Sequence, residues 1–200
     1  MIYLYDTAIC DDLQKSFNPD NVDNPVVKVI SPEGILALVG QIKEDNCTFP
    51  IVALQRHPEV TVATSRQNFT ATKFGVECVY DKDTNNIYYE KSVPIDLQYD
   101  LSILTTSTAD MDELVKEILF KYSNMYFLTL QLPYECKRKV RFGIKIAPDS
   151  LVETKSSSFE YLSTGKLYES SMTLVCEGCV LVSYTPPKHM ENYVQRFEIK

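Results

Sequence analysis

The stretch from Val93 to Tyr122 constrains the fold of this chain more than any other. Between residues 95 and 103 apolar side chains alternate with polar ones, which predicts a strand with one buried and one wet face. The apolar set is Ile95, Leu97, Tyr99, Leu101 and Ile103. Residues 105–110 then supply capping oxygens and acidic groups, so a helix is expected to begin near Thr108 to Asp110.

The expected helix carries an apolar stripe at three- and four-residue steps, which predicts that it packs on the apolar face of a sheet. The stripe consists of Met111, Leu114, Val115, Ile118, Leu119 and Tyr122. On the opposite side, Asp112 precedes Lys116 and Glu117 precedes Lys121 by four residues, which indicates a solvated face. The strand and the helix together predict one β-α layer.

The other segments predict further helices and strands around this layer. A first helix is expected to be capped by Asp6 and to bury Ile9, Cys10, Leu13 and Phe17, and a second to run from about Pro32 to Lys43. Strands are expected at Phe49–Gln55, Phe74–Tyr80, Ile87–Lys91, Met125–Leu132 and Val140–Ile146. The polar segment 56–73 is expected to be an exposed loop or an irregular edge, and 147–166 an extended loop. The order predicts one α+β domain over residues 1–200, with an antiparallel or mixed sheet and helices mainly on one face.

Leu167–Cys176 and Gly178–Tyr184 are predicted to form a hairpin that turns at Glu177-Gly178. In that hairpin Leu174 faces Leu181, while Val175, Val180 and Val182 cover the other side, so both faces are apolar. Such a ribbon needs cover from helices, from another part of the chain or from another subunit. Its candidate contact residues are Leu174, Val180, Val182 and Tyr184.

The charge balance argues against a nucleic-acid surface. The chain has a net charge of −7 and a pI near 4.9, whereas phosphate binding needs a basic patch. One basic cluster interrupts this balance, formed by Lys137, Arg138, Lys139 and Arg141. Its simplest interpretation is a solvated start of a strand, and the alternative is contact with an acidic partner surface. No stretch reaches the roughly 18 apolar residues that span a bilayer, so we expect no membrane role.

Cys176 and Cys179 have the C-x-x-C spacing of half a zinc site or of a redox pair. A structural zinc site needs four ligands, and the remaining cysteines form no second pair of this kind. The simplest interpretation is two buried thiols, and a metal-binding enzyme that uses them stays the alternative. The sequence contains no nucleophile elbow, P-loop or dinucleotide fingerprint. We therefore expect no catalytic residues, no cofactor and no enzymatic activity.

The block VPIDLQYDLSILTTSTADMDELVKEILF resembles a pattern of tail-completion and neck proteins of tailed bacteriophages, in which a strand of this type runs into a helix that begins with acids. The matching residues are Pro94, Ile95, Leu97, Tyr99, Leu101, Glu113, Leu114, Val115, Glu117, Ile118, Leu119 and Phe120. The resemblance implies an α+β fold like that of tail terminators and a structural role in the virion.

Tail terminators are small subunits that form a six-fold ring, stop polymerisation of the tail tube and present a surface to the head connector. The resemblance thus implies a homo-oligomer with the tail tube or sheath and the head-connector proteins as partners, assembled in the host cytoplasm and located in the tail or neck. Head-to-tail contacts close such a ring, and the predicted hairpin and the 147–166 loop are candidates for them. Another head-tail connector or a baseplate adaptor is the alternative.

Overall fold

The computed structural model describes residues 2–18, 27–34, 37, 48–63, 75–81, 86–132, 139–148, 150, 153–157 and 167–184. For 75–81, 86, 90, 153–157 and 182–184 it describes the backbone alone. The elements in these residues are α1 (Tyr3–Phe17), β1 (Lys28–Ile30), a 3-10 turn (Pro32–Gly34), β2 (Ile51–Val62), β3 (Gly75–Asp81), β4 (Asn86–Thr105), α3 (Thr108–Tyr122), β5 (Tyr126–Gln131), β6 (Lys139–Ile146), β7 (Glu153–Ser157) and β8 (Leu167–Tyr184).

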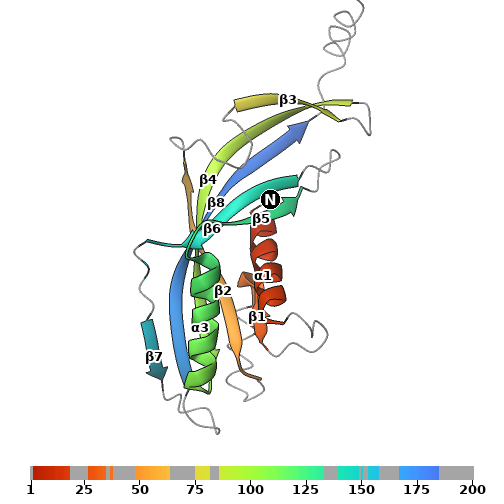
Figure 1. The fold of residues 1–200 in the computed structure, drawn as a ribbon. Helices are drawn as coiled ribbons and strands as arrows, with labels where there is room; N and C mark the ends of the chain where they lie inside the picture. The colour runs from red at the N-terminus through yellow and green to blue at the C-terminus, as the bar shows by residue number, and fades with distance from the viewer. Residues whose placement is uncertain are drawn as a thin grey trace, which may run out of the picture.

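The strands form one curled, mixed sheet in the order β1-β2-β4-β8-β6-β5, with β3 paired to β4 and β7 paired to β8 (Figure 1). Only the β1–β2 pair is parallel, and the other described pairs are antiparallel. Together with the two described helices, this confirms the expected α+β class with a mixed sheet.

The centre of the sheet is the antiparallel pair β4–β8, which runs without a break from Tyr89 opposite Tyr184 to Thr105 opposite Tyr168. β4 has 20 residues and would extend about 65 Å if straight. α1 and α3 have 15 residues each, which is about 22 Å along the helix axis. The pair is therefore longer than the helix layer, and Figure 1 shows β3 with the adjoining ends of β4 and β8 beyond the ends of α1 and α3.

Both described helices pack on the same face of the sheet, as expected. The predicted apolar face of β4 is buried, with Ile95 2% exposed and the other four residues fully covered. α1 contributes Tyr5, Ile9 and Leu13 to this core, and α3 contributes Met111, Leu114, Ile118 and Tyr122. Below, the face of the sheet opposite the helices is called the outer face.

The expected hairpin at Glu177-Gly178 is wrong, because β8 is a single strand. Gly178 pairs with Ile95 in the middle of β8, and Leu174 lies opposite Tyr99 rather than Leu181. Glycine is required here for space and not for a turn, since a Cβ on Gly178 would lie 2.7 Å from the Tyr5 ring. α1 thus packs directly on the backbone of β8.

Several other boundaries differ from the expectations. β2 continues through Val62, past a register shift between Arg56 and Val60, so the start of the 56–73 segment is an irregular strand, the second of its two expected forms. The expected loop 147–166 contains β7, which extends the sheet along β8. The expected helix over residues 32–43 shows a 3-10 turn at its start, and residues 35, 36 and 38–43 lie outside the described residues. α1 begins at Tyr3 rather than at an Asp6 cap.

Candidate functional site

The predicted contact residues of β8 fall into three groups. Leu174 is fully buried in the core, so its side chain is not accessible to a partner. Val180 is partly buried and packs against the same core. Val182 and Tyr184 belong to β8 by their backbone, and their side chains lie outside the described residues. The described part of the predicted surface therefore faces the protein interior.

The C-x-x-C pair does not form a site. Cys176 lies opposite Leu97 and Cys179 opposite Pro94 in an unbroken register, so the two side chains project from opposite faces of one strand. Both are buried, and burial raises the pKa of the Cys176 thiol well above its usual range. The spacing thus does not bring the two sulfurs together for one metal ion or a disulfide.

Among the residues that the structure describes, no three His, Cys, Asp or Glu side chains gather as a metal site would require. His57 lies on the outer face, where its ring is 2.8 Å from Asp100, and Asp100 accepts a hydrogen bond from Thr173 at 3.1 Å. These three side chains link β2, β4 and β8. His57 and Asp100 are about half exposed, so the three residues form a polar cross-strand cluster on the surface of the sheet.

A buried polar cluster fixes α1 to the sheet. Asp6 is 8% exposed and accepts hydrogen bonds from the Tyr99 hydroxyl at 2.8 Å and from Arg56 at 2.5 Å. Burial, reinforced by the nearby Cys176 and Asp6, raises the pKa of Tyr99. The hydroxyl therefore keeps its proton and donates a hydrogen bond to the Asp6 carboxylate. Asp6, which was expected to cap the helix, instead accepts hydrogen bonds from Tyr99 and Arg56.

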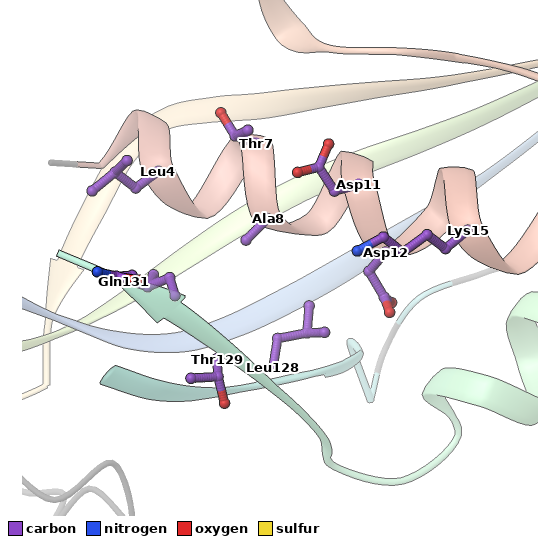
Figure 2. A pocket seen from close by; sticks show the side chains of 10 residues that line it. Leu4, Thr7, Ala8, Asp11, Asp12, Lys15, Leu128, Thr129 and Gln131 are labelled. Carbon is purple, nitrogen blue, oxygen red and sulfur yellow. The ribbon is translucent and has the colours of Figure 1, made fainter. Parts of the chain in front are cut away.

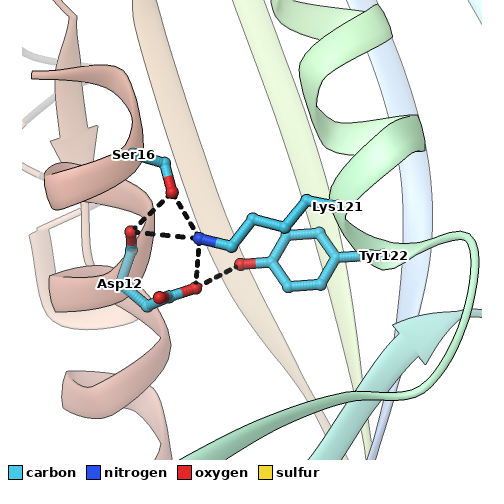
Figure 3. Close-up of polar contacts among 4 residues, drawn as sticks. All are labelled: Asp12, Ser16, Lys121 and Tyr122. Atoms are coloured by element: carbon cyan, nitrogen blue, oxygen red, sulfur yellow. Dashed lines mark hydrogen bonds and ion pairs between the residues drawn. The ribbon is translucent and has the colours of Figure 1, made fainter.

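A second cluster joins α1 to α3 (Figure 3). The Asp12 carboxylate lies 2.7 Å from the Lys121 ammonium and accepts a hydrogen bond from the Tyr122 hydroxyl at 2.8 Å. Lys121 also donates to the Ser16 hydroxyl. The expectation that Lys121 lies on the solvated face is therefore wrong, because its ammonium points inward to α1. The sequence offers no local signal for a contact between residues this far apart.

A groove of about 320 Å³ lies between α1 and the edge strand β5 (Figure 2). Asp11, Asp12 and Lys15 line it from α1, and residues 128–131 line it from β5. Asp12 is already held by Lys121 and Tyr122. The groove therefore combines a charged helix flank with a strand edge, without a nucleophile and base in hydrogen-bond contact.

The structure describes two of the four residues of the basic cluster. Lys137 and Arg138 lie outside the described residues, whereas Lys139 and Arg141 are exposed on the outer face of β6. The Arg141 guanidinium lies 4.1 Å from the centre of the Phe127 ring on β5. We use the term basic patch for the exposed outer-face residues of the paired strands β5 and β6, namely Phe127, Thr129, Gln131, Lys139 and Arg141.

The outward side of α3 forms a second exposed surface, here called the α3 ridge. It consists of Glu113, Lys116, Glu117 and Phe120. Phe120 is 78% exposed, and the neighbouring Leu119, which was expected in the buried stripe, is 37% exposed. Sequence reasoning did not single out Phe120 as exposed, although it lies about 200° around the helix from the buried Ile118. This rotation between positions 118 and 120 is the sequence signal that places Phe120 on the exposed side of α3.

No protein-family model matches this chain, and no curated protein matches it in sequence. Within the described part of the chain, none of the helices combines the length and the apolar character needed to cross a bilayer.

Proposed function

We propose that this chain is a structural subunit of a tailed-phage virion, a tail terminator or neck protein that forms a ring on the tail tube and joins it to the head. The β4–α3 unit carries the proposal. The residues of the resemblance, Pro94 to Phe120, lie in the second half of the long central strand and in the helix that folds back on its apolar face. A strand that runs into a helix supports the proposal, since the resemblance rests on that order of elements.

The edges of the sheet support a role in assembly. β1 and β5 stand at the two ends of the strand order, and each pairs with one neighbour among the described strands. Strand edges of this kind present backbone donors and acceptors to another chain. The long β4–β8 pair adds reach beyond the helix layer, which suits contacts between neighbouring subunits in a ring.

Binding to purified virion parts tests the proposal. The protein is mixed with isolated tail tubes, and separately with empty heads, of the phage that encodes it, and bound particles are imaged by electron microscopy. The proposal expects a ring at one end of the tube. Binding to heads alone would replace the terminator with a head-tail connector, and binding to neither would overturn the proposal.

The alternative enzyme that uses Cys176 and Cys179 is addressed by metal analysis of the purified protein. Because the two thiols face opposite sides of β8, we expect no stoichiometric zinc after dialysis. Zinc that survives dialysis at one ion per chain would overturn this expectation and support the alternative of a metal-binding enzyme.

A further inference from the structure

We propose that, in the ring of the proposed function, the α3 ridge of one copy binds the basic patch of the next copy. The inference rests on that function for the existence of a ring and adds which two surfaces form the contact. The occupant of each surface is thus a second copy of this chain.

Among the described residues, the two cations of the basic patch are not paired with a carboxylate. Lys145, further along β6, lies 3.3 Å from Glu177 and is neutralised by it. Lys139 and Arg141 form no ion pair with a carboxylate of the described residues, although the chain carries seven more negative than positive charges. The exposed Phe127 ring beneath Arg141 adds an apolar contact area.

The α3 ridge offers the complementary chemistry. Lys121 turns inward to Asp12, so Glu117 loses the cation that its spacing would have supplied. Two carboxylates, Glu113 and Glu117, then flank a single cation, Lys116, and Phe120 lies almost fully exposed at the end of the ridge. An acidic surface with one aromatic group matches a basic surface with one aromatic group.

The positions of the two surfaces favour contact between copies. α3 packs on one face of the sheet, whereas Arg141 alternates with the buried Val140 and Phe142 and therefore lies on the outer face. Two complementary patches that face opposite ways give a heterologous contact, and repetition of that contact closes a ring when the rotation between neighbouring copies closes. An isologous dimer formed through either patch alone would bring like charges together.

Charge reversal tests the contact, with oligomer mass measured by light scattering after size exclusion. Variant A carries Lys139→Glu and Arg141→Glu, and variant B carries Glu113→Lys and Glu117→Lys. Each variant alone opposes like charges, and we expect the concentration at which rings form to rise at least about tenfold. Lys15→Glu and Glu59→Lys, at exposed positions off both surfaces, serve as matched controls.

A mixture of A and B distinguishes lost contact from misfolding. In the mixture the acidic patch of A meets the basic ridge of B, and the basic patch of B meets the acidic ridge of A, so an alternating ring of six closes. We expect the mixture to regain the wild-type mass. Variants that assemble like wild type, or a mixture that stays dissociated, would overturn the contact while leaving the wild-type ring, and thus the proposed function, in place. A wild-type chain that forms no ring would count against both.

Discussion

The Tyr5 hydroxyl occupies the place of a strand partner for Cys179. It donates a hydrogen bond to the Cys179 carbonyl at 2.6 Å and accepts one from the Cys179 N–H at 2.9 Å. The pairing of β6 with β8 ends at Glu177, just before this residue. A side chain from α1 thus satisfies the buried backbone groups of β8 where the neighbouring strand stops.

Tyr5→Phe should lower the free energy of unfolding by about 2 to 3 kcal/mol, because it leaves a buried N–H and a buried C=O without partners. Urea unfolding followed by circular dichroism measures the change. Tyr3→Phe on the same helix is the matched control, since Tyr3 is 54% exposed, and should change stability by less than about 0.5 kcal/mol. Equal effects of the two substitutions would contradict this role of Tyr5.

Gly178→Ala should destabilise the protein by about 1 to 3 kcal/mol, because the added methyl group would collide with the Tyr5 ring. Gly143→Ala is the control, since its Cβ would meet the flexible end of Met125, which can move aside. Thermal unfolding of both variants makes the comparison. A Gly178 variant that is as stable as the Gly143 variant would argue against direct packing of α1 on β8.

Lys121→Met should lower the free energy of unfolding by about 2 to 3 kcal/mol, because it leaves the Asp12 carboxylate without its cation at a largely buried position. Lys116→Met on the exposed side of the same helix should cost less than about 0.5 kcal/mol. Denaturant unfolding gives both values. If the two losses are the same, the α1–α3 contact does not contribute as described.

Alkaline pH should destabilise the fold. Burial, reinforced by Asp6 and Asp11, raises the pKa of Cys10 to about 12, and burial also raises the pKa of Tyr99 and Tyr122. In the unfolded chain cysteine ionises near pH 8.5 and tyrosine near pH 10. Above about pH 9 the unfolded state therefore binds fewer protons than the folded state, and the free energy of unfolding falls as pH rises.

Urea unfolding at a series of pH values between about 8 and 11 measures this dependence. Cys10→Ala should reduce the slope, since it removes one of the groups that bind a proton more tightly in the folded state. Stability that stays constant or rises over this interval would contradict the stated burial of these side chains.

The parts of the fold that follow from one-faced periodicity could be predicted from the sequence. The alternation from Ile95 to Ile103 is buried as predicted, and Ile9 and Leu13 of α1 and Met111 and Ile118 of α3 pack against it. In these segments the local pattern and the tertiary packing favour the same structure, so the local pattern alone predicts which side chains are buried.

The wrong expectations concern residues whose surroundings come from distant parts of the chain. Glu177-Gly178 has the composition of a turn, yet the long pairing with β4 and the Tyr5 ring keep it extended. Asp6 has the composition of a cap, yet Tyr99 and Arg56 bind its carboxylate. Local propensity identifies neither case, because the deciding partners lie 50 or more residues away.

The candidate surfaces were predictable only in part. The basic cluster was visible in the sequence, and Lys139 and Arg141 are exposed as a contact would need. The exposure of Leu119 and Phe120 depends on how α3 is rotated on the sheet, which Met111, Leu114, Ile118 and Tyr122 determine by their burial.

The mass of the wild-type protein in solution, measured by light scattering over a concentration series, tests the ring most directly. The proposal predicts a species near six times the 22.9 kDa chain mass, or a monomer that closes into such a ring as concentration rises. A strict monomer at every concentration would contradict it.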